Sequence, residues 1–177
     1  HLLKKYNQNI YTDLDIFYSL HRNKCITVTG TNGKSTTCKL LYNILKDQKI
    51  DVKLVGNIGT PILLKKKISK KTIFVIEASS YQLEYSKIFN SKYAAILNIS
   101  SDHLERHGNL KNYVSAKFKL LENQKKGSKS FINKNDKLIQ NNIRKISYKS
   151  NIKNIDLKVN KLLKKKITNK YFLSRTN

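Results

Sequence analysis

The sequence predicts an α/β protein with a mostly parallel central sheet, helices on both faces and a small β-rich C-terminal part. Segments expected to form strands alternate with segments whose apolar residues recur at helical spacing. Two strand segments, 72–77 and 93–99, are continuous apolar runs, as expected for parallel strands buried on both faces. A glycine-containing stretch, 29–36, lies between a strand segment and a helical segment, which is where phosphate-binding loops occur.

At 177 residues the chain is long enough for one well-packed core. Its two cysteines, Cys25 and Cys38, lack metal-ligand spacing and are expected to be buried free thiols in a reducing compartment. No apolar run is long enough to cross a bilayer, so we expect a cytoplasmic protein without membrane insertion. The chain has no methionine, and we expect it to be a piece of a longer protein.

The formal net charge of +25 arises from 36 Lys and Arg against 11 Asp and Glu. An excess of this size can bind nucleic acid or an anionic membrane through counterion release. The basic residues are mostly lysines scattered along the chain, and they form no recognisable nucleic-acid-binding module. We therefore favour a compositional bias over specific nucleic-acid binding. The lysines also make a favourable field for anionic substrates.

The N-terminal part begins with residues 1–23, which are expected to be a lead-in outside the core with a short helix near 13–17. A first strand is expected at 24–29. A helix follows over 34–47, because its apolar residues recur at helical spacing and form one face. A short strand at 52–55 then leads into a tight loop that contains two glycines and a proline.

The next two strands end on polar side chains. The strand at 72–77 ends on Glu77, and the strand at 93–99 is followed by Asp102 and His103. Ligands bind at the carboxyl ends of the strands in α/β sheets. We therefore expect two adjacent strands to deliver metal-competent side chains to one edge.

The remaining elements are a helix over 110–123 and a strand over 130–133, followed by a helix that Asp136 caps. Lys117 lies on the apolar side of the first of these helices, where a lysine usually extends its charge to the surface. Short strand-like pieces then form the β-rich end; they are expected at 146–148, 155–159 and 171–173.

The chemistry of the stretch 29–36 follows from its residue types. Gly30 and Gly33 allow a tight turn and let the backbone approach an anion closely. Lys34 can reach the β- and γ-phosphates of a nucleotide, and the hydroxyl of Ser35 can bind Mg²⁺. The longest form of the phosphate-loop pattern would have glycine at Val28, so an ordinary glycine-rich turn is the alternative.

Five spaced motifs together resemble the central ATP-binding domain of the Mur ligases, the cytoplasmic bacterial enzymes that add amino acids to the peptidoglycan precursor. They occur at 29–36, 56–59, 77–84, 98–108 and 116–117. The block 77–84 (Glu-Ala-Ser-Ser-Tyr-Gln-Leu-Glu) resembles the member of the family that adds D-glutamate. The resemblance spans residues 12–136.

The resemblance implies a P-loop NTPase-like fold and a division of the chain. Residues 1–23 would lead in from an absent UDP-binding domain, and residues 24–177 would form the central domain. That domain would be incomplete at its C-terminal end, because the family's later His-Asn-x-x-Asn segment is missing. The domain that brings the amino acid would also be absent, and the isolated fragment is expected to be inactive.

The resemblance also implies a reaction. ATP would phosphorylate the carboxylate of UDP-N-acetylmuramoyl-L-alanine, and the amine of D-glutamate would attack the acyl phosphate, in a protein expected to be a monomer. The catalytic residues would be Lys34, Glu77, His103 and Lys117. The ATP phosphates would be held by Gly30, Thr31, Asn32, Gly33, Lys34, Ser35 and Thr36.

The same resemblance supplies ligand and substrate roles. Two Mg²⁺ sites are implied: Ser35 and Glu77 would hold the first, and His103 the second. Lys117 would become a metal-compatible anion after carbamylation by CO₂. The muramoyl substrate would be contacted by Asn57, Ser79, Gln82 and His103. For Ser79 and Gln82 the alternative is hydrogen bonding within their own loop. For Asp102 and His107 the alternative is that they only shape the loop in which they lie.

Two alternatives remain open. One is another amide ligase of the superfamily, either the diaminopimelate- or lysine-adding enzyme or folylpolyglutamate synthase. The sequence Tyr81-Gln82-Leu83-Glu84 argues against these. The other is a non-catalytic basic domain that binds a nucleotide or nucleic acid, and two metal-competent side chains aimed at one phosphate argue against it.

Overall fold

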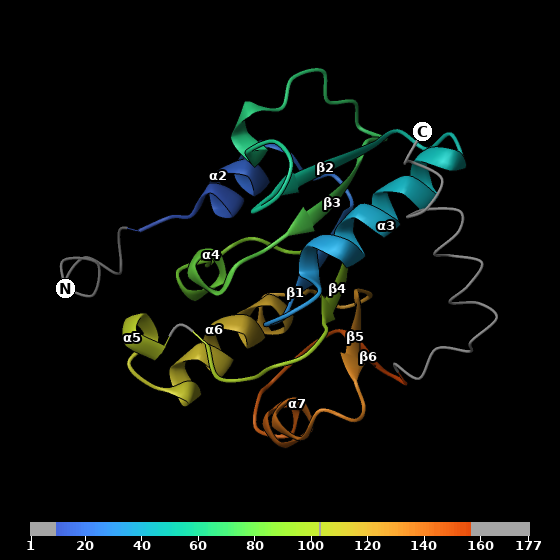
Figure 1. Cartoon of the computed structure of the whole chain (residues 1–177). Helices are drawn as coiled ribbons and strands as arrows, with labels where there is room; N and C mark the ends of the chain where they lie inside the picture. The colour runs from blue at the N-terminus through green and yellow to red at the C-terminus, as the bar shows by residue number, and fades with distance from the viewer. Residues whose placement is uncertain (1–9, 103, 157–177) are drawn as a thin grey trace, which may run out of the picture.

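The computed structural model describes residues 10–102 and 104–156. Within these residues six parallel strands form one sheet in the order β2-β3-β1-β4-β5-β6 (Figure 1). The predicted parallel sheet is therefore confirmed. The strands are β1 (Cys25–Thr29), β2 (Val52–Gly56), β3 (Ile73–Glu77), β4 (Tyr93–Ile96), β5 (Lys129–Asn133) and β6 (Asn151–Ile155).

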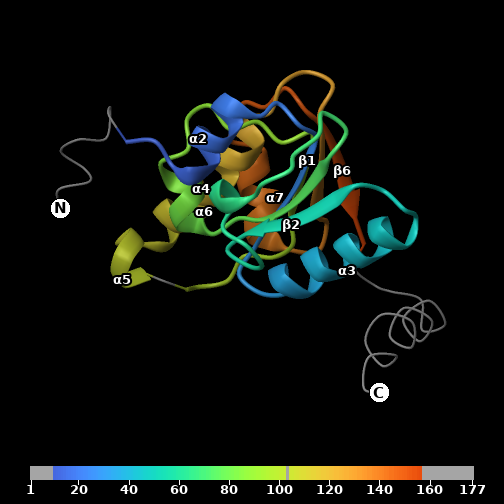
Figure 2. The same cartoon turned by 90° about the horizontal axis from the view of Figure 1, so that it is seen from above.

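Helices cover both faces of the sheet, as predicted. Figure 2 shows α3 on one side of the strands and α2, α4 and α6 on the other. The helical elements are α2 (Asp13–Leu20), α3 (Lys34–Asp47), the 3₁₀ turn η2 (Ile62–Leu64), α4 (Ser80–Glu84), α5 (Leu104–His107), α6 (Leu110–Glu122) and α7 (Lys137–Ile143).

The core is divided by the sheet into two apolar clusters of unequal size. The larger cluster joins α2, α4, α6 and α7 to the strands and includes Phe17, Phe74 and Phe118. The smaller cluster lies under α3 and contains Val28, Cys38 and Val75. Both cysteines are buried and free, as predicted.

Side-chain caps explain where several helices begin. Thr12 and Asp15 form a capping box at the start of α2, and Asn109 caps α6. The oxygen of Asp136 accepts a hydrogen bond from the backbone N–H of Ile139 at the start of α7, as the sequence predicts.

The expectation that the lead-in lies outside the core is wrong for α2. The side chains of Leu14 and Phe17 are fully buried. The carboxylate of Asp15 is buried as well, and it accepts backbone hydrogen bonds from Ile88 and Phe89 at 2.9 Å each. The helix is therefore attached to the loop before β4 by both apolar and polar contacts.

The C-terminal elements differ from those predicted. Residues 146–148 form no strand, because the chain leaves α7 through a turn and extended coil before β6. The strand expected at 155–159 instead occupies Asn151–Ile155 and extends the main parallel sheet. Residues 157–159 and the strand predicted at 171–173 lie outside the described residues.

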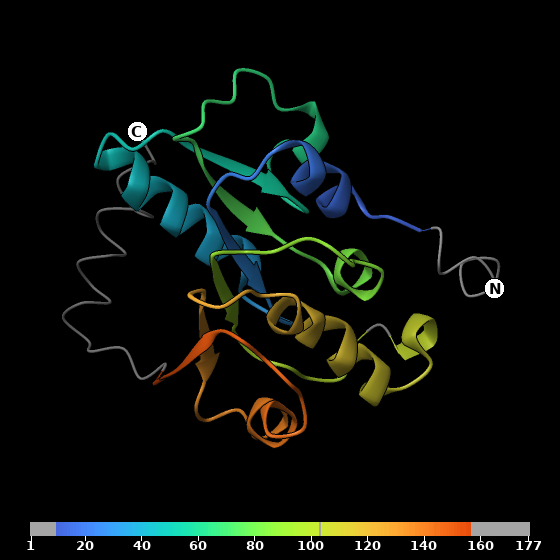
Figure 3. The ribbon, with the colours of Figure 1, turned by 180° about the vertical axis from the view of Figure 1, so that it is seen from behind.

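The strand order defines the functional edge of the sheet. The chain leaves β1 toward β2 on one side, whereas β4 continues to β5 on the other, so a topological switch point lies between β1 and β4. β3 and β4 each pair with β1 rather than with each other, which corrects the prediction that they are adjacent. Figure 3 shows β3 leading into α4, which packs beside α6.

Candidate functional site

The phosphate loop follows β1 and has the backbone that its glycines permit. Gly33 has a φ of 81° and stands at the N-cap of α3, where no side chain caps the helix. The N–H groups of the first turn are therefore available to an anion. Gly30 has a φ of 150°, and a Cβ atom there would lie 3.2 Å from Leu97 Cβ.

Residues just beyond β4 hold this loop in place. The side chain of Asn98 accepts a hydrogen bond from Asn32 N at 2.8 Å and donates one to Asn32 O at 3.0 Å. The hydroxyl of Thr31 accepts from Ser100 N at 3.0 Å. The strand predicted to run to residue 99 ends at Ile96 instead, because the backbone after it turns to bind the phosphate loop.

Two lysines from different helices converge on this loop. Lys34 Nζ lies 3.0 Å from Gly30 O and 2.7 Å from Thr31 O, and it donates to both oxygens. Lys117 Nζ, from α6, donates to the same Gly30 oxygen at 2.9 Å. Positive charge on these two side chains would attract an anion such as a phosphate.

Lys117 is buried in an unusual setting for a lysine. Its side chain is 2% exposed, and its Nζ lies 4.5 Å from the centre of the Tyr113 ring. Burial and the nearby charge of Lys34 lower the pKa of Lys117 to about 7, although Asp102 acts in the opposite direction. The side chain thus does not extend to the surface, which is the usual arrangement for a lysine on the apolar side of a helix.

Glu77 is the last residue of β3, and the two oxygens of its carboxylate differ in their hydrogen bonding. Its Oε1 accepts a hydrogen bond from Asn57 Nδ2 at 3.1 Å. Its Oε2 is buried, and no donor in residues 10–102 or 104–156 bonds to it. A buried carboxylate oxygen in this state can receive a cation.

The end of β2 fits closely against Glu77. Gly56 has a φ of 102°, and a Cβ atom there would overlap the backbone oxygen of Glu77. The backbone N–H of Asn57 donates to that same oxygen at 2.9 Å. Gly56 thus allows Asn57 to reach the carboxylate.

A cavity of about 250 Å³ opens beside these groups. It is bounded by four of the residues predicted for the site together with four others. Its walls are formed by Lys34, Asn57, Ser79, Ser80, Tyr81, Asp102, Tyr113 and Lys117. A larger hollow of about 450 Å³ lies at the opposite edge of the sheet near Arg22 and Ser69, away from the phosphate loop.

Ser79 and Gln82 form a capping box at the start of α4. Ser79 Oγ accepts from Gln82 N at 3.3 Å, and Gln82 Oε1 accepts from Ser79 N at 3.1 Å. The amide of Gln82 also donates to Asp13 of α2 at 2.8 Å. Both side chains thus have the local hydrogen-bonding role that was the alternative to substrate contact, although Ser79 also borders the cavity.

Other predicted residues lie at the rim of the site or outside the described chain. Asn32, Ser35 and Thr36 are exposed on the phosphate loop and the first turn of α3. His103, predicted as a catalytic residue and metal ligand, lies outside the described residues.

Sequence reasoning missed Asn98 and Tyr113 as residues of the site. Tyr113 stands one helical turn before Lys117, which could have indicated it.

The described residues hold neither a metal-binding cluster of acidic, histidine and cysteine side chains nor a membrane-spanning helix. No cluster of three or more His, Cys, Asp or Glu side chains with metal-binding geometry occurs in 10–102 and 104–156. In the same part of the chain, no helix combines the length and apolar character needed to span a membrane.

Comparison with known proteins gives consistent matches. Residues 28–176 match the Mur ligase middle domain family. The chain is 39% identical over 168 residues to the UDP-N-acetylmuramoylalanine--D-glutamate ligase of Rickettsia bellii, a match that covers 94% of this chain and 37% of that protein. It is 44% identical over 115 residues to the ligase of the same name from Phenylobacterium zucineum, covering 65% of this chain and 24% of that protein. The chain thus spans between about a quarter and somewhat over a third of the length of these relatives.

Solved structures share the fold. The ADP complex of MurF ligase from Thermotoga maritima superposes with a TM-score of 0.61 at 26% identity, over 78% of this chain and 34% of that one. The UDP-N-acetylmuramate:L-alanyl-gamma-D-glutamyl-meso-diaminopimelate ligase of Neisseria meningitides gives a TM-score of 0.63 at 18% identity, over 80% and 49% of the two chains.

Proposed function

The chain belongs to the Mur ligase middle domain family, and from that premise we propose that it is the ATP-binding domain of a ligase that adds D-glutamate to UDP-N-acetylmuramoyl-L-alanine. The curated relatives carry the name of that ligase and are about three times as long as their matched part. We accordingly propose that further domains bind the UDP-sugar and bring the amino acid, and that the whole protein is a cytoplasmic monomer.

One observation carries the proposal for the site. Lys34 and Lys117 converge on Gly30 O at the carboxyl edge of the sheet, and Glu77, whose buried Oε2 accepts no hydrogen bond within the described residues, ends the neighbouring strand β3 at the same edge. A loop with free N–H groups, the cation of Lys34 and a buried carboxylate suit a triphosphate and its metal ion. The loop N–H groups and Lys34 would hold the phosphates, with Lys34 leaving its contacts to the loop carbonyls.

The residues present fit a magnesium ion. Glu77 supplies an available buried carboxylate oxygen, and Ser35 supplies an exposed hydroxyl at the start of α3. When bound, Mg²⁺ would neutralise charge on the transferred phosphoryl group. Asn57 would keep Glu77 oriented through its bond to Oε1. A second Mg²⁺ near His103 remains part of the proposal.

Lys117 fits carbamylation, since only an uncharged amine adds to CO₂. A pKa of about 7 leaves a large share of this amine neutral at neutral pH. Carbamylation would replace a cation with an anion that can face Mg²⁺. The carbamate nitrogen keeps one N–H, which can still donate to Gly30 O.

The reaction proposed for the whole protein proceeds in two steps. The γ-phosphoryl group of ATP is transferred to the terminal carboxylate of the muramoyl substrate, and the amine of D-glutamate then displaces phosphate. The domain contributes by positioning and by neutralising charge. Asn57 and Ser79 border the cavity where the acceptor carboxylate would lie. Gln82 would support this wall of the cavity through its hydrogen bond to Asp13 of α2.

The test is phosphate release by the full-length gene product with Mg-ATP, bicarbonate and UDP-N-acetylmuramoyl-L-alanine. D-glutamate, L-glutamate, diaminopimelate and L-lysine are supplied in turn. We expect release only with D-glutamate, and its loss in Lys34→Ala. Release with another amino acid would assign the protein to a sister ligase. Binding of random DNA that is steeply salt-dependent and indifferent to ATP would favour the nucleic-acid alternative.

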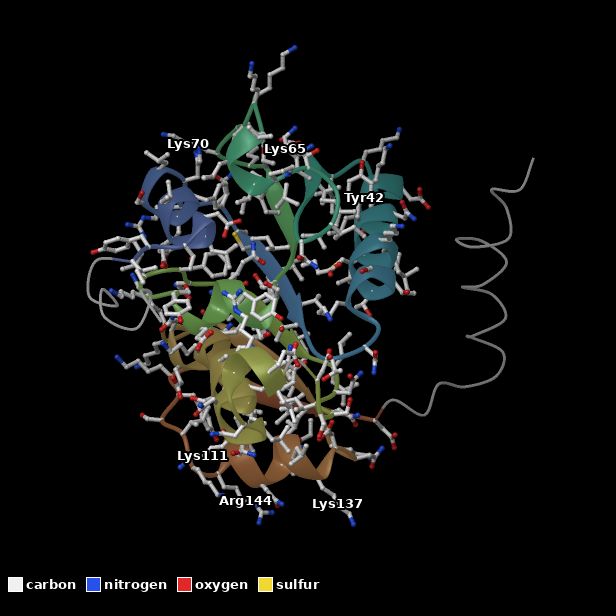
Figure 4. The ribbon with its side chains drawn as sticks, turned by 60° about the vertical axis from the view of Figure 1, so that its left-hand side comes forward. Tyr42, Lys65, Lys70, Lys111, Lys137 and Arg144 are labelled. Atoms are coloured by element: carbon white, nitrogen blue, oxygen red, sulfur yellow. The ribbon has the colours of Figure 1, made fainter. Side chains whose placement is uncertain are left out.

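The basic side chains give this last alternative little support. Lys65 and Lys70 project from one end of the molecule, and Lys111, Lys137 and Arg144 project from the other (Figure 4). A charge spread over both ends suits surface solvation better than a single nucleic-acid groove.

A further inference from the structure

His107 of α5 is buried against the wall of the cavity, and the proposed reaction gives it no role. It is 3% exposed, and its Nε2 lies 3.0 Å from the hydroxyl oxygen of Ser80, the first residue of α4. Its Nδ1 lies 3.6 Å from Glu84 Oε2, at the other end of α4. One imidazole therefore contacts both ends of the short helix that borders the cavity.

Two aromatic rings of the cavity wall pack against the same imidazole. The Tyr81 ring stacks on it at 5.5 Å between centroids with an interplanar angle of 19°. Arg106, the preceding residue of α5, places its guanidinium 4.1 Å from the centre of the Tyr81 ring. Tyr113 meets His107 edge-on at 5.4 Å.

Tyr113 continues the contacts as far as the phosphate loop. Its hydroxyl lies 3.1 Å from Thr31 Oγ1, and its ring faces Lys117 Nζ. Ser80, Tyr81 and Tyr113 all border the cavity, whereas His107 does not. His107 therefore acts on the site only through these neighbours.

We propose that His107 is a positioning residue that fixes Ser80 and Tyr81 in the cavity wall on the side of the muramoyl acceptor. This inference rests on the proposed function. The hydrogen bond to Ser80 sets the direction of a hydroxyl at the cavity, and the stacking sets the plane of Tyr81. Nucleotide binding, on the phosphate-loop side of the cavity, depends instead on the position of Tyr113. The edge-on contact that holds Tyr113 requires only an aromatic ring at position 107.

Two substitutions separate the hydrogen bond from the ring contacts. His107→Phe keeps an aromatic ring against Tyr81 and Tyr113 but loses the bond to Ser80. His107→Gln keeps a group able to bond to Ser80 Oγ. His21→Phe is the matched control, because His21 packs against Phe17 at 5.3 Å, away from the cavity.

In the full-length gene product we expect His107→Phe to raise the KM for UDP-N-acetylmuramoyl-L-alanine about tenfold, the worth of one hydrogen bond, and to leave the KM for ATP within about twofold. His107→Gln should restore the part of the acceptor KM that depends on the bond to Ser80. Ser80→Ala should raise it by itself and add nothing in the His107→Phe background, because both changes remove the same bond.

The outcomes separate this inference from the proposed function. A wild-type protein that shows no ligase activity with D-glutamate would refute the proposed function. An active wild type whose acceptor KM is unchanged in His107→Phe, or changes equally with the KM for ATP, would refute the role of His107 alone. If His107→Phe does not fold, Ser80→Ala carries the test, and an unchanged acceptor KM there would refute the inference.

Discussion

Lys34 and Lys117 donate hydrogen bonds to the same atom, the backbone oxygen of Gly30, at 3.0 Å and 2.9 Å. One lysine begins α3 and the other lies in the middle of α6, so both helices meet at the turn after β1. Burial, and after it repulsion from the nearby charge of Lys34, lowers the pKa of Lys117. An anion bound between them would remove this repulsion.

Lys117 should make folding stability depend on pH. Its pKa falls from 10.5 to about 7 on folding, so above pH 7 the unfolded chain binds more protons than the folded one. Stability should therefore rise between pH 7 and 8.5, by at most about 1.5 kcal/mol. Above that range the buried thiols of Cys25 and Cys38, with pKa values raised to about 12, act in the opposite direction.

Urea unfolding of wild type and Lys117→Met at pH 7 and pH 8.5 measures the contribution of Lys117 to this rise in stability. The rise should disappear in Lys117→Met, which removes the titrating group. Lys111→Met, an exposed position on the same helix, should keep it. An equal rise in wild type and Lys117→Met would show that Lys117 is not the source.

Asn98→Ala should weaken nucleotide binding without unfolding the protein. The amide holds both the N–H and the carbonyl of Asn32, so its loss frees the tip of the phosphate loop. We expect about a tenfold loss of ADP affinity, equivalent to about 1.4 kcal/mol, measured by isothermal titration. Asn135→Ala, at an exposed turn, is the control. Unchanged affinity in Asn98→Ala would mean that the loop keeps its shape without this contact.

Asp15→Asn should reduce stability at neutral pH and lose its effect in acid. Burial raises the pKa of Asp15, but hydrogen bonds from the backbone of Ile88, Phe89, Lys87 and Thr12 outweigh it, so the pKa lies below 3.8. A carboxyl with a lowered pKa stabilises the fold above its unfolded pKa, and this contribution is lost as pH falls through the folded pKa.

Denaturant unfolding at pH 7 should show a loss of about 2 to 3 kcal/mol in Asp15→Asn, and the difference from wild type should shrink below pH 3.8. A difference that stays constant down to pH 2 would show that the charge of Asp15 is not what stabilises the loop before β4.

Gly56→Ala should destabilise the protein more than Gly127→Ala. Both glycines have positive φ angles, 102° and 81°, so both alanines would be strained. Only at Gly56 would the new Cβ overlap backbone, since the nearest atom at Gly127 is the mobile Lys92 Nζ at 3.7 Å. We expect about 1 kcal/mol at Gly127 and about 3 kcal/mol at Gly56 by chemical denaturation. Equal losses would argue against close packing of β2 on Glu77.

Much of the fold could be predicted from the sequence because its signals are local. The apolar runs before Gly30 and before Glu77 are strands, and the helical spacing after Lys34 is a helix. The short helices α4 and α5 were missed, since four or five residues carry no apolar period.

The site was less predictable because its contacts join distant segments. Asn98 next to Asn32 and the two lysines at Gly30 depend on the strand order, which periodicity does not specify. The burial of Leu14 and Phe17 was missed because a short polar lead-in has no distinctive apolar pattern. The capping box at Ser79 and Gln82 fits a sequence signature for helix starts; local hydrogen bonding was the alternative to a substrate contact there, but the helix itself was not predicted.

The central claim is that the edge near Gly30 and Glu77 is a magnesium–nucleotide site. The most direct measurement is the ADP affinity of this chain with and without Mg²⁺, in wild type, Glu77→Gln and the remote control Glu122→Gln. We expect Mg²⁺ to tighten binding in wild type and Glu122→Gln, and to have little effect in Glu77→Gln, where the buried Oε2 no longer carries charge. The same Mg²⁺ dependence in Glu77→Gln and wild type would contradict the account.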